Sequence, residues 1–173
     1  LHGQARFDVA RDVERPFSVQ ASGQRVVATG TAFNIDLLDS DLRVTLIEGS
    51  AVVLGTVGRE QARPAEEDHG IELVVGEQVV VSADATHSVA PASIERTTAW
   101  QDGRLMFEDE ALSTVARRMN RYSRQPLVIA DERTAQLRIS GVFKTNDVDG
   151  FVTTITHYFP LQARPRGDGT IEA

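Results

Sequence analysis

Apolar and polar residues alternate with a period of two through most of the first half of the chain. The alternation is clearest at residues 17–21, 33–37 and 43–46. Successive side chains of a β-strand point to opposite faces, so this pattern predicts strands with one buried face. Turn-forming residues separate the runs and favour antiparallel connections. They are Ser22-Gly23, Asp39-Ser40-Asp41, Glu48-Gly49 and Gly76-Glu77. We expect an all-β sandwich or a rolled β structure here.

In the second half, the apolar spacing changes to the three- and four-residue repeat of amphipathic helices. The first stripe follows a strand predicted around residues 105–107, and Glu108-Asp109 is expected to cap its helix. The second stripe follows a strand predicted at residues 137–143, and Asn146-Asp147 is expected to cap it. The two stripes are Leu112, Val115, Ala116, Met119 and Tyr122, and Val148, Phe151, Val152, Ile155 and Phe159.

Shorter strands complete this half. Pro126 ends the first helix and opens a strand at residues 127–129. Residues 161–164 are expected to pair with residues 170–172 as a hairpin across Gly167-Asp168-Gly169. The resulting order of elements is βαββαββ.

The change of period divides the chain into two predicted domains. Residues 1–95 form an all-β unit and residues 96–173 a small βαββαββ unit, so the predicted fold class is α+β. A chain of 173 residues is long enough for real cores, because a domain of this size buries roughly 70% of its unfolded surface.

Charge and composition exclude several classes of function. The chain has 18 basic and 25 acidic side chains, a balance that argues against a nucleic-acid-binding surface. It has no cysteine, which removes disulfides, thiol catalysis and cysteine-ligated zinc. No apolar run is long enough for a membrane helix. The start at Leu1-His2-Gly3 has neither an initiator methionine nor a signal-peptide pattern, so we expect a fragment.

An ordered series of short signatures runs along the chain. They are Arg15-Pro16-Phe17-Ser18-Val19, Gly30-Thr31-Ala32-Phe33-Asn34-Ile35, Glu48-Gly49 and Trp100-Gln101-Asp102-Gly103-Arg104-Leu105-Met106-Phe107. In this order they resemble the extracytoplasmic half of FecR-type anti-sigma regulators, from about Phe7 to Glu172. The βαββαββ unit resembles the short secretin and TonB amino-terminal (STN) domain in topology and patterning.

The resemblance implies a non-enzymatic relay in cell-surface signalling. In such proteins, an outer-membrane TonB-dependent transducer loaded with a ferric siderophore presents its signalling domain to this region. The signal then crosses the inner membrane to an ECF sigma factor through a transmembrane helix and a cytoplasmic domain, which this chain lacks. The implied location is the periplasm of a Gram-negative bacterium, in an inner-membrane single-pass protein.

Residue chemistry adds no catalytic or metal site to this interpretation. The four histidines are widely spread, without the spacing of metal ligands, and no nucleophile elbow or phosphate loop is present. We therefore expect no cofactor, no metal and no enzymatic activity. The arginines that accompany the first apolar stripe are interpreted as a solvated face. They are Arg117, Arg118, Arg121 and Arg124. Trp100 is expected to pack the two units together.

Strand edges are the better candidates for partner binding, because an incoming strand can pair with their unsatisfied main-chain groups. Pro126 and Pro165 border short strands, and proline is tolerated mainly at edges and strand ends. We predict that the docking edge is one of two segments. They are Leu127, Val128 and Ile129, and Leu161, Gln162, Ala163 and Arg164. The alternative function is a carbohydrate- or cell-wall-binding β module fused to a small α/β domain, which calls for exposed aromatic platforms.

Overall fold

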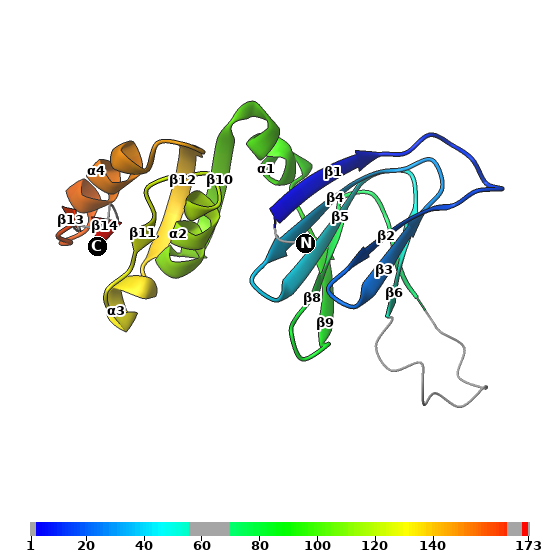
Figure 1. Cartoon of the computed structure of the whole chain (residues 1–173), viewed down its shortest axis with the longest axis horizontal. Coiled ribbons are helices and arrows are strands. Elements are labelled where there is room, and N and C mark those ends of the chain that lie inside the picture. Colours follow the sequence, from blue (N-terminus) through cyan, green and yellow to red (C-terminus); the bar gives the residue numbers. More distant parts are fainter. Residues whose placement is uncertain (1–2, 56–69, 166–170, 173) are drawn as a thin grey trace. The chain divides into compact units, whose positions relative to one another are not determined.

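The computed structural model describes residues 3–55, 70–165 and 171–172 (Figure 1). The chain divides into two compact units, Leu1–Thr97 and Thr98–Ala173, and each has its own hydrophobic core. The first described unit is built almost entirely of strands, and the second mixes helices with short strands. The α+β fold class predicted from the sequence is therefore confirmed.

Two antiparallel sheets build the first unit. One has five strands in the order β1-β4-β5-β8-β9, and the other has four in the order β2-β3-β6-β7. The strands are β1 (Gly3–Asp8), β2 (Phe17–Ala21), β3 (Gln24–Ala28), β4 (Ala32–Leu38), β5 (Asp41–Glu48), β6 (Ala51–Gly55), β7 (Ile71–Leu73), β8 (Glu77–Val81) and β9 (His87–Pro91), followed by helix α1 (Ile94–Thr98). Apolar residues of both sheets form one shared core, which includes Val26, Phe33 and Leu46.

Strand β4 departs from the predicted pattern of one buried face. Its polar residues Asn34 and Asp36 are only 1% and 6% exposed, so both faces of the strand are covered. Gln4 of β1 donates hydrogen bonds from Nε2 to the carbonyl of Thr97 (3.1 Å) and to Oδ1 of Asn34 (3.5 Å). The polar residues that alternate with apolar ones in β4 are therefore buried, although the pattern predicted that they face solvent.

Two of the sequence signatures meet in space. The amide and carbonyl of Thr31 both hydrogen-bond the main chain of Val9, at 3.1 and 2.9 Å. The hydroxyl of Thr31 donates to the carbonyl of Ser50 at 2.8 Å. Gly49 has φ +82°, and a Cβ there would lie 2.6 Å from the carbonyl oxygen of Gly30. A side chain at Gly49 would thus be excluded both by the backbone conformation and by the space available.

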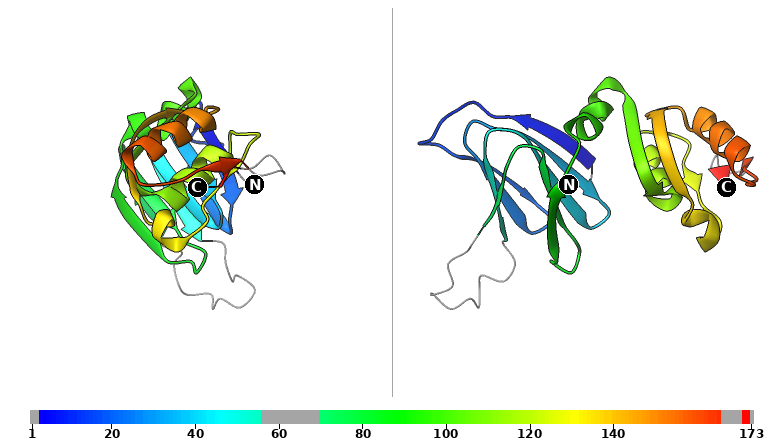
Figure 2. Two further views of the ribbon diagram at one scale, coloured as in Figure 1. Left: turned by 90° about the vertical axis from the view of Figure 1, so that its left-hand side faces the viewer. Right: turned by 180° about the vertical axis from the view of Figure 1, so that it is seen from behind.

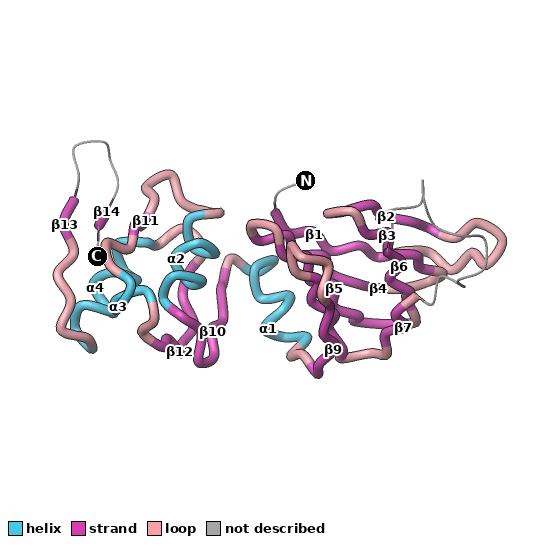
Figure 3. The backbone as a smooth tube through the Cα atoms, turned by 90° about the horizontal axis from the view of Figure 1, so that it is seen from below, coloured by secondary structure: helices cyan, strands magenta, loops and turns pink. Residues whose placement is uncertain are grey.

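The second unit contains two small sheets. Strands β10 (Arg104–Ala111) and β12 (Arg138–Lys144) pair antiparallel and lie side by side (Figure 2). A three-stranded sheet has the order β11-β14-β13. Its strands are β11 (Leu127–Val128), β13 (Arg164–Pro165) and β14 (Ile171–Glu172). The helical elements are η1 (Ala99–Asp102), α2 (Leu112–Asn120), α3 (Glu132–Ala135) and α4 (Val148–Tyr158), seen as cyan segments in Figure 3.

Both apolar stripes predicted from the sequence are confirmed. The stripes on α2 and α4 form the core of this unit together with Leu105, Phe107, Leu127 and Ile139. At the end of each stripe, Tyr122 and Phe159 are half-buried against the same core. Helix α4 also begins as predicted, because the Asp147 side chain accepts a hydrogen bond from the amide of Gly150 (2.9 Å).

The predicted cap of the first helix is wrong. Strand β10 continues through Glu108-Asp109 to Ala111, with an irregularity between Phe107 and Glu110. Asp109 there has φ +48°, and no side chain caps α2. The amide of Leu112 instead donates to the carbonyl of Leu137 at 2.8 Å, so the cap comes from the neighbouring chain segment.

The predicted C-terminal hairpin is confirmed only at its strand ends. Arg164 pairs with Glu172 and Pro165 with Ile171, both antiparallel. The strand prediction for residues 161–163 is wrong, because the strand begins at Arg164. The predicted turn at Gly167-Asp168-Gly169 lies outside the described residues.

Arg118 contradicts the prediction that the arginines near α2 form a solvated face. Its side chain is 9% exposed, and Nη1 donates to both carboxylate oxygens of Glu110 at 2.9 and 3.1 Å. The guanidinium also lies over the ring of Phe107, 5.1 Å from the ring centre. The charge is therefore held in the core by one carboxylate and one aromatic face. Arg117 and Arg124 are exposed, as predicted.

We predict that Glu110→Ala lowers the free energy of unfolding by about 3 kcal/mol, because it leaves the Arg118 charge buried without its partner. Trp100 is the only tryptophan and packs against the core of this unit, so its fluorescence during urea unfolding measures the change. Arg117→Ala, on the exposed side of α2, is the control and should change stability by less than about 0.5 kcal/mol. Equal losses in both variants would contradict the prediction.

Candidate partner-binding surface

Both segments predicted to dock a partner lie at the borders of the three-stranded sheet. Strand β11 pairs parallel to the central strand β14, and β13 pairs antiparallel to it on the other side. Each strand has two residues in the ladder, which makes this sheet short. Among the described residues, the outer edges of β11 and β13 carry no further strand.

The edge of β11 is closed by a side chain. The amide of Leu127 donates to Oδ1 of Asn120 at 2.7 Å, and Nδ2 of Asn120 donates to the carbonyl of Leu127 at 2.8 Å. Asn120 is the last residue of α2, so its carboxamide takes the place that the main chain of a neighbouring strand would take. An incoming strand would have to displace it to pair with Leu127.

The rest of this segment divides between core and surface. Val128 is 38% exposed, whereas Ile129 is half-buried against the core of the second unit and lies beyond the end of β11. The next turn is fixed by Asp131, whose carboxylate caps α3. Hydrogen bonds from the amide and hydroxyl of Thr134 lower the pKa of the Asp131 carboxyl. This chain segment is therefore anchored on both sides of Val128.

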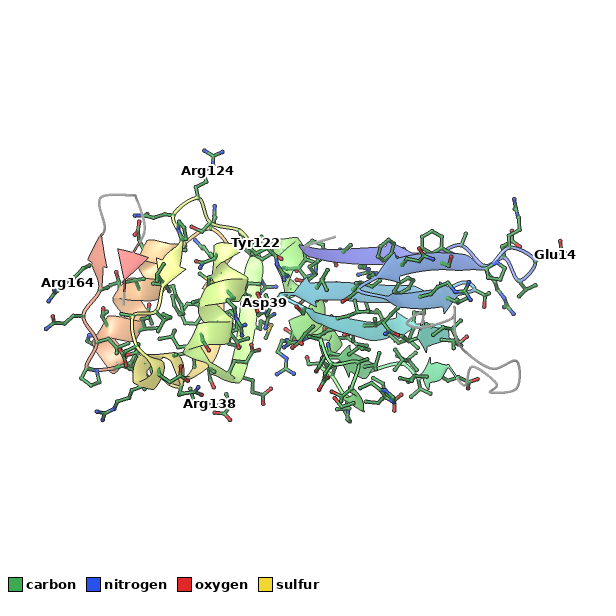
Figure 4. The ribbon with its side chains drawn as sticks, turned by 60° about the horizontal axis from the view of Figure 1, so that its bottom comes forward. Glu14, Asp39, Tyr122, Arg124, Arg138 and Arg164 are labelled. Carbon is green, nitrogen blue, oxygen red and sulfur yellow. The ribbon has the colours of Figure 1, made fainter. Side chains whose placement is uncertain are left out.

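The segment that leads into β13 is more open. Leu161 and Ala163 pack against the core, whereas Gln162 and Arg164 are exposed. The amide of Leu161 donates to the carbonyl of Phe159 at 2.7 Å, and the Arg164 guanidinium donates to the Gln162 side chain at 3.2 Å. Figure 4 shows Arg164 pointing outward from the strand. The amides of Gln162 and Ala163 have no partner among the described residues.

Trp100 lies in η1 and packs against the core of the second unit. Its role in packing the two units together stays a prediction. The histidines that the structure describes, His87 and His157, lie in different units. Over the described ranges, no three His, Asp or Glu side chains gather as metal ligands would. No described helix has the length and apolar character that crossing a bilayer requires.

Two features of the second unit were not found from the sequence. One is the Asn120 carboxamide, although an asparagine at the end of an apolar stripe, a few residues before a short strand, could have indicated it. The other is the open side of β12, which the sequence predicted only as a strand. Its cationic Arg138 forms an ion pair with Asp109 at 3.0 Å, which lowers the pKa of the Asp109 carboxyl.

The first unit contains a region that matches a known family. Residues 1–52 match the model of the family described as FecR protein. This range runs from β1 through β5 and includes the start of β6, so it holds the contact between the Gly30 and Gly49 signatures. No curated protein sequence matches the chain.

The fold of the whole chain also has a counterpart among solved structures. Two crystal structures of a candidate anti-sigma factor from Parabacteroides distasonis, at 1.65 and 2.50 Å resolution, match with TM-scores of 0.78 and 0.77. Sequence identity is 22%, and the match covers 99% of this chain and 76% of the other. At this identity, the likeness concerns the fold. The chain is thus similar to FecR proteins over residues 1–52 and shares its fold with a candidate anti-sigma factor.

We predict that Asn120→Ala lowers the free energy of unfolding by about 1–3 kcal/mol, because the main-chain groups of Leu127 lose their partners. The amide of Leu127 should also exchange with solvent faster. Gln136→Ala is a matched control, since it removes a carboxamide that is exposed and bonds only the Glu132 side chain. Unchanged exchange at Leu127 in Asn120→Ala would show that the carboxamide does not hold the strand.

Proposed function

We propose that this chain is the extracytoplasmic sensor portion of a FecR-like anti-sigma regulator and works as a non-enzymatic relay. The observation that carries the proposal is the FecR match over residues 1–52 on a fold shared with a candidate anti-sigma factor. In this proposal, the chain lies in the periplasm. It belongs to a single-pass inner-membrane protein whose cytoplasmic part holds an ECF sigma factor.

The proposed input is the signalling domain of an outer-membrane TonB-dependent transducer, loaded with a ferric siderophore. Such a partner can shift a regulator only if it binds two states of that regulator with different affinity. We propose that the second unit receives it, as an STN-like domain. Its arrangement of α2 and α4 with one two-stranded and one three-stranded sheet supports this proposal.

Of the two predicted docking segments, we favour Leu161, Gln162, Ala163 and Arg164. The reason is the difference between the main-chain hydrogen bonds of the two segments. The amide and carbonyl of Leu127 are already bonded to Asn120, whereas the amides of Gln162 and Ala163 have no partner among the described residues. A strand that adds to a sheet edge gains affinity from such unpaired groups.

The glycan-binding alternative has less support. Sugar rings stack on exposed aromatic platforms. Among the large apolar side chains that are exposed in the described residues, the aromatic ones are Phe17 and Tyr158. Phe17 of β2 contacts the ring of Phe7 at 5.8 Å, and Tyr158 of α4 contacts the ring of His157 at 5.4 Å. Each unit therefore exposes one large aromatic side chain among the described residues.

Isothermal titration of the chain against purified signalling domains of transducers from the same genome tests the proposal. We expect one domain to bind with micromolar or tighter affinity, about −8 kcal/mol or better. If no domain binds a chain that is folded by circular dichroism, the relay proposal is wrong.

The docking edge is tested by Ala163→Pro, which removes an amide that has no partner in the described ranges. We expect affinity for that transducer domain to fall about tenfold or more, because the main-chain bond cannot form. Ala10→Pro makes the same change at an exposed loop position of the first unit and should bind as the unaltered chain does. Full binding by a folded Ala163→Pro variant would exclude this edge and leave the regulator assignment standing.

A further inference from the structure

Strand β12 has one paired side and one open side. The amide of Thr145 donates to the carbonyl of Gly103 (2.9 Å), and the amide of Leu112 donates to the carbonyl of Leu137 (2.8 Å), at the two ends of the β10–β12 ladder. Hydrogen-bonded residues alternate along an antiparallel ladder, so the odd-numbered residues of β12 face β10. The main-chain groups of Ser140 and Val142 therefore point away from β10.

No group in the described part of the chain pairs with these outward groups. Among the described residues, β12 has β10 as its neighbour and no strand on the other side. The amides and carbonyls of Ser140 and Val142 have no partner within the described ranges. The strand thus offers two consecutive outward positions, with a donor and an acceptor at each, in the geometry that an added strand needs.

An apolar cavity of about 270 Å³ adjoins this open side. Arg138 and Ser140 are among its lining residues, and its other walls come from β12 and from the end of α4. The wall residues are Ile139, Phe143, Thr154, Ile155, Tyr158 and Phe159. Pockets that hold small molecules are usually about 300–1,000 Å³, so this cavity is better suited to one large side chain than to a metabolite.

The cavity and the strand edge form one site. Residues that face each other across paired strands lie on the same side of the sheet. A partner residue opposite Ile139 would therefore lie on the core face, against α4 and at the cavity. Tyr158 at the cavity is 77% exposed and would gain cover from the added strand.

Charge selects the occupant. Arg138 and Lys144 lie at the two ends of β12, both exposed. Arg138 is paired with Asp109 at 3.0 Å, whereas Lys144 has no side-chain partner among the described residues. A second copy of this chain, paired antiparallel with Ser140 opposite Val142, would place Arg138 opposite Lys144. Like charges directly opposite each other destabilise strand pairs, so this register disfavours a second copy. Lys144, which has no side-chain partner among the described residues, favours an acidic residue opposite it.

We propose that the open edge of β12 binds an extended, acidic segment of another protein, which pairs with Ser140 and Val142 and inserts one large apolar side chain into the cavity. This surface is separate from the β11 and β13 edges. The inference therefore does not depend on the proposed transducer.

The first test is amide hydrogen exchange of the free chain. The amides of Ser140 and Val142 should exchange fast, whereas those of Ile139 and Gly141, which face β10, should be protected. Slow exchange at Ser140 and Val142 in the free chain would overturn the proposal, because the edge would then already be paired.

The second test is selection of a displayed library of random peptides on the whole chain. We expect enriched peptides to share a large apolar residue near acidic ones and to slow exchange at Ser140 and Val142. No enrichment, or enriched peptides that leave these amides unchanged, would overturn the proposal. Transducer domains play no part here, so either result leaves the test of the relay proposal independent.

A matched pair of variants on α4 separates the cavity from general effects on the helix. Thr154 lines the cavity and Thr153 does not, and each hydroxyl donates to the carbonyl four residues earlier at 2.8 Å. Thr154→Phe should fill the cavity and weaken the selected peptides about tenfold, which is about 1.4 kcal/mol. Thr153→Phe, at an exposed position, should leave their affinity within about twofold. Equal binding to both folded variants would overturn the proposed anchor.

Discussion

The need to satisfy main-chain hydrogen-bonding groups at strand edges is the constraint on which the second unit depends. Among the described residues, each strand of its three-stranded sheet has two residues in the ladder. The Asn120 carboxamide hydrogen-bonds the amide and the carbonyl of Leu127. Where β10 is irregular, the Ser140 hydroxyl accepts a hydrogen bond from the amide of Asp109. At Ser140 and Val142, no such substitute is found within the residues that the structure describes. Closed and open edges together define where a partner can add a strand.

The two units solve the burial problem differently. In the first, two sheets share one core, and even the polar side of β4 is covered. In the second, the apolar stripes of the helices form much of the core, and the charged side chain of Arg118 is buried beside it. A buried charge is tolerated because Glu110 and the Phe107 ring hold the guanidinium in a fixed place. That placement ties the last part of β10 to the helix that follows it.

Much of this arrangement was predictable from local pattern. The period-two runs predicted strands such as β4 and β5, the helical stripes predicted α2 and α4, and the Asp147 cap followed from residue type. Predictions failed where a distant partner decides the outcome. Asp109 was expected to cap a helix, yet Arg138 and a strand irregularity hold it. The sequence pattern predicted Arg118 to lie at the surface, but its ion pair with Glu110 holds it in the core. The candidate edges could be listed from prolines, but Asn120 closes one of them through contacts that no periodicity reveals.

The ladder between β1 and β4 has a mechanical consequence. All six residues of β1 pair with β4, from Gly3 opposite Leu37 to Asp8 opposite Ala32, and Phe7 stacks on Phe33 with ring centres 5.1 Å apart. A force along the axis of β1 would load all of these pairs in shear at once. A force across the strand would instead open them one after another, from the end. We therefore expect the β1–β4 ladder to resist tension along the strand more strongly than tension across it.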